Sequence, residues 1–151
     1  VLNGNRAPSL WEGLTFSHRG EPAGVMPYFR PRGTRVLISD LFWLGEPQLT
    51  VRPFAERAAC AIVLQVLARE DVDPPVGRSV RLVDAETDEL REIHIDAVVA
   101  RRYREALARH QESWDQVCRR HGAIFLSLVA EDFLRNWNLD VLVAAEVLRV
   151  R

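Results

Sequence analysis

The sequence predicts an α/β domain built on a mainly parallel sheet, with flanking helices and an inserted β-hairpin. Three short apolar runs, at residues 36–39, 61–67 and 123–129, have the length and composition of strands buried on both faces. Segments with helical spacing of apolar residues lie between and after these runs. Because strands that alternate with helices form parallel sheets with right-handed crossovers, we expect one domain over residues 34–151. Residues 1–33 are interrupted by nine Gly and Pro residues, which predicts an irregular lead-in packed on the domain.

The first half of the predicted domain has a strand–helix–strand pattern. A β-branched run over residues 36–38 is closed by Ser39 and Asp40. Apolar residues recur at helical spacing over residues 49–59, which predicts a short helix in which Pro53 is tolerable only in the first turn. The second strand follows, and a charged, proline-containing turn over residues 69–75 ends it.

The second half of the domain begins with a hairpin and the longest helix. Residues 79–84 and 90–95 flank a polar turn, and the alternation in the second arm predicts a half-exposed hairpin. Asp96 is expected to cap a helix that ends at Gly122. The apolar stripe of this helix comprises Val99, Tyr103, Ala106, Leu107, His110, Trp114, Val117 and Cys118. The third strand is followed by a short helix and a last apolar segment, over residues 131–134 and 141–150.

Composition excludes several classes of function. The 151 residues carry a formal net charge of −1, and a chain without a basic field is not expected to bind nucleic acid. All 20 basic residues are Arg, which excludes a lysine nucleophile and a P-loop lysine. No stretch approaches the roughly 20 apolar residues of a membrane helix, so we expect no membrane segment. Cys60 and Cys118 have no metal-ligand spacing and no signal-peptide-like segment accompanies them, which indicates buried thiols in a reducing compartment, the cytoplasm.

The best candidates for chemistry follow the first strand. In parallel α/β sheets ligands bind outside the carboxyl ends of the strands, which is where Ser39 and Asp40 are expected to lie. A carboxylate at a buried strand end, with a hydroxyl beside it, can supply oxygen ligands to Mg²⁺. The same carboxylate can instead accept backbone N–H groups and cap the following turn. The residues alone leave both roles open.

The loop after Asp40 is unusually apolar. Leu41, Phe42 and Trp43 are large apolar residues at a position where a loop is normally polar. They form either a plug of the core beneath the adjacent helix or a docking surface for a protein partner.

Other polar residues have structural interpretations. Asp71 and Asp73 suit an ordinary turn, and His110 suits a hydrogen-bonded core histidine on the apolar stripe. The basic cluster 101–104 opens an amphipathic helix with interleaved acids, which is typical of a solvated face.

Several short motifs agree in order and spacing with one bacterial family. They are residues 34–41 (TRVLISDL), residues 62–68 (IVLQVLA) with Asp71 and Pro74, residues 80–87 (VRLVDAET), Tyr103-Arg104 and the strand and turn at 122–132. Through them residues 34–135 resemble the family called domain of unknown function 58. Its members are similar to von Willebrand factor A-type domains, whose sheet is doubly wound and Rossmann-like.

The resemblance implies a metal-ion-dependent adhesion site and shows where this chain departs from it. Such a site uses a DxSxS motif after the first strand, a Thr in a later loop and an Asp after the fourth strand, and Asp40 falls on that last position. The chain has no DxSxS motif and no room before Arg35 for three earlier strands, so it resembles a C-terminal half. We therefore expect no cofactor in this chain and Mg²⁺ only in a longer parent protein.

The resemblance also implies a function. Family members act with MoxR-type AAA+ ATPases in the assembly or maturation of other protein complexes, which predicts a non-enzymatic protein-interaction domain with the loop at residues 41–43 as its contact surface. The alternative is a flavodoxin-like or receiver-like module in which Asp40 is a nucleophile or a Mg²⁺ ligand. Because half a domain leaves the strand at 36–39 without a neighbour, we also expect a homodimer or a larger assembly through this sheet edge, unless residues 1–33 fold over it.

Overall fold

The core of the fold is a parallel sheet. The computed structural model describes residues 28–43, 45–83, 90–136, 140–145 and 147. Within them, three parallel strands lie in the order β1-β2-β5, namely β1 (Thr34–Ser39), β2 (Cys60–Leu67) and β5 (Ile124–Val129). The predicted mixed α/β architecture with a parallel sheet is confirmed. Most of the expected lead-in, the turn of the hairpin and part of the last apolar segment lie outside the described residues.

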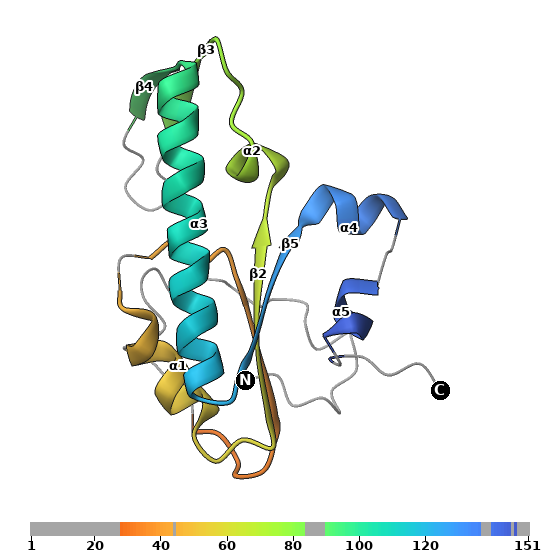
Figure 1. Ribbon diagram of the computed structural model, residues 1–151. Helices are drawn as coiled ribbons and strands as arrows, with labels where there is room; N and C mark the ends of the chain where they lie inside the picture. The colour runs from red at the N-terminus through yellow and green to blue at the C-terminus, as the bar shows by residue number, and fades with distance from the viewer. Residues whose placement is uncertain (1–27, 44, 84–89, 137–139, 146, 148–151) are drawn as a thin grey trace, which may run out of the picture.

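Helices lie on both sides of this sheet. Figure 1 shows α1 (Pro47–Ala55) and α3 (Ala97–Arg120) on one side, and α4 (Ala130–Asn136) and α5 (Asp140–Ala144) on the other. The central strand β2 is covered on both faces, because Ile62 and Val63 point to opposite faces and are 4% and 0% exposed. Two-sided burial explains why β2 has a continuous apolar run instead of an alternating pattern.

Helix α1 differs from its prediction at both ends. It begins at Pro47, two residues before the predicted start at residue 49. It ends at Ala55, four residues before the predicted end at residue 59. Pro47 suits the first helical position because its fixed backbone angle is already helical and its missing N–H needs no partner there. Pro53 lies near the end of the helix, so the prediction that it stands in the first turn is wrong. Its missing N–H leaves one carbonyl of α1 without a helical partner, and the helix ends two residues later.

Helix α3 is the longest element and begins as predicted. The backbone N–H of Val98 and that of Val99 each donate to Oδ1 of Asp96 at 2.8 Å, which confirms the predicted cap. The helix ends before Gly122, whose φ of +70° suits glycine.

Only the C-terminal part of the apolar stripe on α3 is deeply buried. Trp114 and Cys118 are fully buried in the core with Leu41, Val51 and Val63. Val99 and Tyr103 are 39% and 36% exposed, more than a continuous core stripe predicts. The reason is that α3 extends past the sheet toward the hairpin, where fewer elements cover it (Figure 1).

The predicted hairpin forms a separate two-stranded sheet. Strands β3 (Arg78–Val83) and β4 (Leu90–Ile95) are antiparallel, with Val80 opposite Ile93. A single helical turn, α2 (Arg69–Val72), lies between β2 and the hairpin. Asp71 accepts the backbone N–H of Ala68 at 2.8 Å, which agrees with the predicted role of this segment as a turn.

Candidate functional site

The candidate site is the loop at the carboxyl end of β1. The Asp40 side chain is exposed, and its Oδ1 accepts the N–H of Phe42 at 3.3 Å and the hydroxyl of Ser39 at 3.4 Å. The Ser39 hydroxyl also accepts the N–H of Leu41 at 3.1 Å. The two predicted site residues therefore lie together and close a tight turn, which is the capping role that the sequence left open beside the metal role.

Leu41 fixes the path of the loop. Its backbone is left-handed, with φ of +61°, and its side chain is fully buried. The carbonyl oxygen of Leu41 lies 2.9 Å from Nε2 of His110 on α3. Because a carbonyl oxygen only accepts, His110 must carry a proton on Nε2. Burial of the side chain and this hydrogen bond hold a backbone conformation that is unfavourable for leucine.

A buried amide network supports the same loop from beneath. Gln65 of β2 is fully buried, and its Nε2 donates to the backbone oxygen of Asp40 at 2.9 Å. Its Oε1 accepts from Nε2 of Gln111 on α3 and from the hydroxyl of Ser127 on β5, each at 2.9 Å. One side chain thus joins all three strands and α3 at the carboxyl end of the sheet. Sequence reasoning missed this network, and the only signal for it was a glutamine inside an otherwise apolar strand.

The three apolar residues after Asp40 have different environments. Leu41 has no exposed surface, so the predicted contact surface cannot include its side chain. Trp43 is half-buried and packs edge-on against Trp114, with ring centres 5.4 Å apart. Phe42 is 44% exposed and lies over His110, with ring centres 6.4 Å apart. The loop is therefore a core plug at Leu41 and Trp43, while Phe42 faces outward beside Asp40.

Acidic groups also stand at the carboxyl ends of the other two strands. The backbone N–H of Arg69, after β2, donates to Glu131 at 3.0 Å, and its guanidinium pairs with Asp132. Both acids are in the first turn of α4, as predicted. Among the described residues, no group of three or more His, Cys, Asp or Glu side chains could hold a metal ion. Ser39 and Asp40 supply only two side chains, so the described residues do not by themselves make a Mg²⁺ site.

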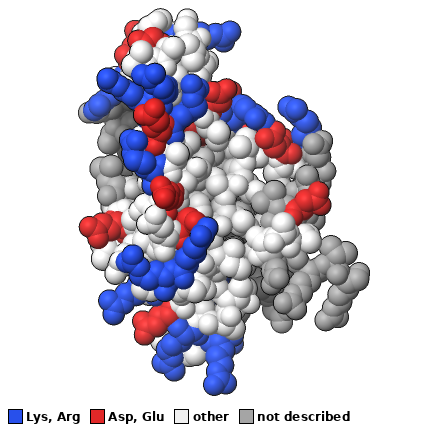
Figure 2. Space-filling model, in the orientation of Figure 1, with Lys and Arg blue, Asp and Glu red and all other residues white. Residues whose placement is uncertain are grey.

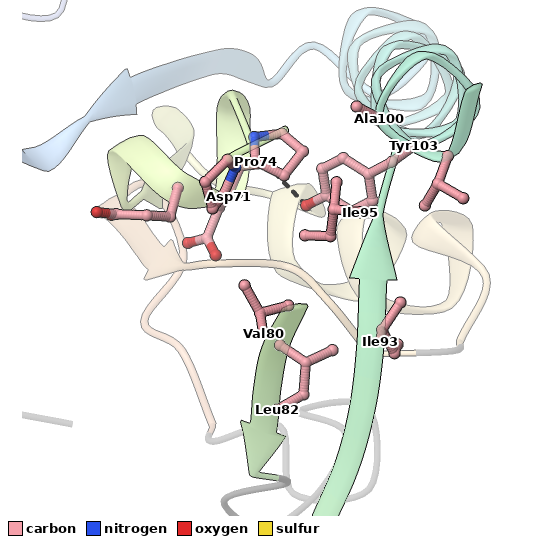
Figure 3. A pocket seen from close by; sticks show the side chains of 11 residues that line it. Asp71, Pro74, Val80, Leu82, Ile93, Ile95, Ala100 and Tyr103 are labelled. Carbon is pink, nitrogen blue, oxygen red and sulfur yellow. Dashed lines mark hydrogen bonds between the residues drawn. The ribbon is translucent and has the colours of Figure 1, made fainter. Parts of the chain in front are cut away.

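A second concave feature lies between the hairpin and α3. Val80, Leu82, Ile93 and Ile95 of the hairpin face Tyr103 across a largely apolar groove of about 370 Å³ (Figure 3). The Tyr103 hydroxyl donates to the backbone oxygen of Asp71 at 2.7 Å, and burial, followed by the charge of Asp71, raises the pKa of this phenol. The alternating apolar residues of the hairpin are the sequence signal for this groove. Which helix these residues face is determined only by the tertiary fold.

Two other predicted surface groups also meet near this groove. Arg104, from the basic cluster 101–104, pairs with Asp73 at 2.8 Å. Both side chains stay substantially exposed, which agrees with a solvated helix face and a turn.

Comparison with known proteins gives relatives without an established function. The chain is 36% identical over 114 residues to an uncharacterized protein of Mycobacterium avium and 35% identical over 114 residues to uncharacterized proteins of Mycobacterium bovis and Mycobacterium tuberculosis. Each match covers 74% of this chain, 64% of the M. avium protein and 34% of each of the other two proteins. No family model and no solved structure matches the chain. Among the described helices, none has the length and apolar character needed to cross a membrane.

Proposed function

We propose that this chain is a non-enzymatic protein-interaction domain of the von Willebrand factor A-like type, related to domain of unknown function 58. In this proposal it acts with a MoxR-type AAA+ ATPase in the assembly or maturation of other protein complexes. One observation carries the proposal: Phe42, 44% exposed, stands beside the exposed Asp40 on a loop that is held in place from three sides.

The rigidity of the loop supports a role in recognition. Hydrogen bonds from Gln65 to Asp40, from His110 to Leu41 and from the Leu41 N–H to Ser39 fix the backbone between the two exposed residues. A preorganised surface loses little conformational entropy on binding, and an aromatic ring beside a charged group is typical of an interface hot spot. The contact surface is therefore reduced from three apolar residues to Phe42 with Asp40, flanked by the half-buried Trp43.

The test is binding of single variants to a purified MoxR-type AAA+ ATPase. Asp40→Ala and Phe42→Ala are expected to weaken binding about tenfold or more in calorimetry, which corresponds to about 1.4 kcal/mol or more for each hot-spot residue. Neither substitution should unfold the domain. Phe42→Ala removes no hydrogen bond of the loop, so its thermal unfolding should match that of the unmodified chain. Asp40→Ala removes the carboxylate that closes the turn and should lower the free energy of unfolding by about 0.5–2 kcal/mol. Glu92→Ala and Val83→Ala on the hairpin are matched controls that should bind normally. Unchanged affinity for both loop variants would exclude this surface.

A titration with Mg²⁺ separates this proposal from the enzymatic or phospho-relay alternative. We expect no saturable Mg²⁺ binding, because among the described residues no group of three or more His, Cys, Asp or Glu side chains could hold a metal ion. Saturable binding that disappears in Asp40→Ala would favour the Mg²⁺-dependent module instead.

A further inference from the structure

The amino end of the sheet gathers cationic side chains that no function above uses. Two hollows, of about 410 and 320 Å³, adjoin there because Glu56 and Arg57 line both of them. Arg35 lines the first hollow, and Arg52 and His121 line the second. Figure 2 shows basic side chains over the lower part of the molecule, the region where Figure 1 places α1 and the C-terminal end of α3, and others along its upper left side.

Arg35 is a buried cation without an anionic partner among the described residues. It is 7% exposed, and its Nη1 donates to the backbone oxygens of Phe54 at 2.6 Å and Glu56 at 2.9 Å. Its Nη2 donates to the backbone oxygen of Arg30 at 3.3 Å, while its buried Nε has no hydrogen-bond partner. Its guanidinium carbon also lies over the Phe29 ring, 4.7 Å from the ring centre. Carbonyl oxygens and an aromatic face offset a buried charge only in part, so an anion nearby is favoured.

Two further side chains around the hollows are free to meet a ligand, and a third lines the wall. Within the part of the chain that the structure describes, neither Arg52 nor Arg57 forms an ion pair. Nε2 of His121 is buried and has no hydrogen-bond partner. Arg57 has φ of +59°, and its carbonyl oxygen accepts the N–H of Arg32, itself at +58°, at 2.7 Å. The turn that carries Arg57 is thus held in an unfavourable backbone conformation.

The ends of the two helices do not neutralise this charge. Helices α1 and α3 both end beside the hollows, and each C-terminus is equivalent to about half a negative charge. Together with the Glu56 carboxylate they offset roughly two of the three guanidinium groups. Among the described residues, a net positive charge therefore faces the hollows.

We propose that the second of these hollows, which Arg52, Arg57 and His121 line and which adjoins the hollow at Arg35, binds the phosphate group of a small phosphomonoester. Guanidinium groups donate parallel N–H groups that match phosphate oxygens, and a charge-assisted hydrogen bond is roughly twice as strong as a neutral one. Arg52 and Arg57 contact the phosphate, His121 forms part of the wall, and buried Arg35 strengthens the field. The site lies at the opposite end of the strands from Asp40, so it is independent of the proposed protein-interaction function.

The test is a titration of the ¹⁵N-labelled 151-residue chain with inorganic phosphate and, separately, with glycerol 3-phosphate, at constant ionic strength. The backbone signals of Arg57 and His121 should shift saturably. Arg52→Gln and Arg57→Gln should each weaken binding about tenfold, the loss expected for one charge-assisted hydrogen bond. Arg109→Gln, an exposed arginine in the middle of α3, is the matched control and should bind normally. Glu56→Gln should bind more tightly, because it removes a carboxylate that repels the anion.

The outcomes separate the two sources of phosphate. Tighter binding of glycerol 3-phosphate would identify an ester as the ligand class, as proposed. Equal affinity for the two probes would overturn the ester and leave a site for free phosphate. Shifts that do not saturate, or affinities that are the same in Arg52→Gln and Arg57→Gln as in the unmodified chain, would exclude the site. Circular dichroism of each variant establishes that a loss of binding is not a loss of fold.

Discussion

Cys118 shows how burial changes the chemistry of one side chain. Its thiol is fully buried, and this burial, followed by the charge of Asp115, raises its pKa from 9.0 to about 12. Cys60, at the start of β2, is only half-buried. The prediction of two buried thiols is thus confirmed for Cys118 and holds only in part for Cys60. The thiolate is the reactive form of cysteine, so the two residues should react very differently.

At pH 8 we expect a thiol reagent to modify Cys60 in the native chain and Cys118 only after unfolding in guanidinium chloride. The raised pKa of Cys118 also links the free energy of unfolding to pH. Its contribution to this free energy is fully present below pH 9 and declines as the pH rises from 9 toward 12, because the folded state holds the thiol proton more tightly. Absorbance of the released chromophore counts the modified thiols, and Cys60→Ala should leave no fast phase. Equal rates for both cysteines in the native chain would contradict the burial of Cys118.

At the scale of elements, the sequence indicated the strands and helices better than the contacts between them. Each strand of the parallel sheet has its own apolar run in the sequence. Asp96 likewise lies within three residues of Val98 and Val99, whose N–H groups it accepts. The Gln65 network depends on partners 25, 46 and 62 residues away, so no local pattern could predict it. The loop at residues 41–43 was ambiguous for a related reason: burial there is decided by Trp114 and His110 on a distant helix.

Gln65→Leu tests whether the network stabilises this end of the sheet. The leucine would leave the backbone oxygen of Asp40 without its donor and would remove an acceptor from Gln111 and Ser127. We expect the free energy of unfolding in urea to fall by about 2–3 kcal/mol, since a buried group left without a partner costs about 1–3 kcal/mol. Gln116→Leu, on the exposed surface of α3, should change it by less than about 0.5 kcal/mol. A loss no larger than that of the control would show that the network contributes little.

The whole molecule distributes unevenly the charges that nearly cancel in the sequence. Carboxylates of Asp40, Glu131 and Asp132 follow the carboxyl ends of the strands, where Arg69 pairs with Asp132. Arg52 and Arg57 stand at the amino end, where Glu56 is the only carboxylate that lines the hollows among the described residues. The formal net charge of −1 conceals this arrangement, because composition carries no information about position. The two proposals made above therefore concern opposite ends of one sheet, and each can fail without the other.

The edge of the sheet at β1 carries the last prediction, which concerns assembly. Among the described residues β1 pairs only with β2, and its Val36 and Ile38 side chains are 53% and 64% exposed. An apolar strand with a free edge tends to pair with another chain, and a twofold axis would close such a pairing into a dimer. We therefore expect light scattering coupled to size-exclusion chromatography to give the mass of a dimer.

A charge on this strand should disrupt the pairing. Ile38→Lys and Val36→Lys are expected to give the mass of a monomer, because natural edge strands use lysine to prevent such contacts. Val83→Lys, on the exposed hairpin, introduces the same charge at a comparably exposed valine and should leave the dimer intact. If the unmodified chain is a monomer at high concentration, β1 does not mediate self-association. If instead all three variants dissociate, the interface extends to the hairpin and is not confined to the edge of the parallel sheet.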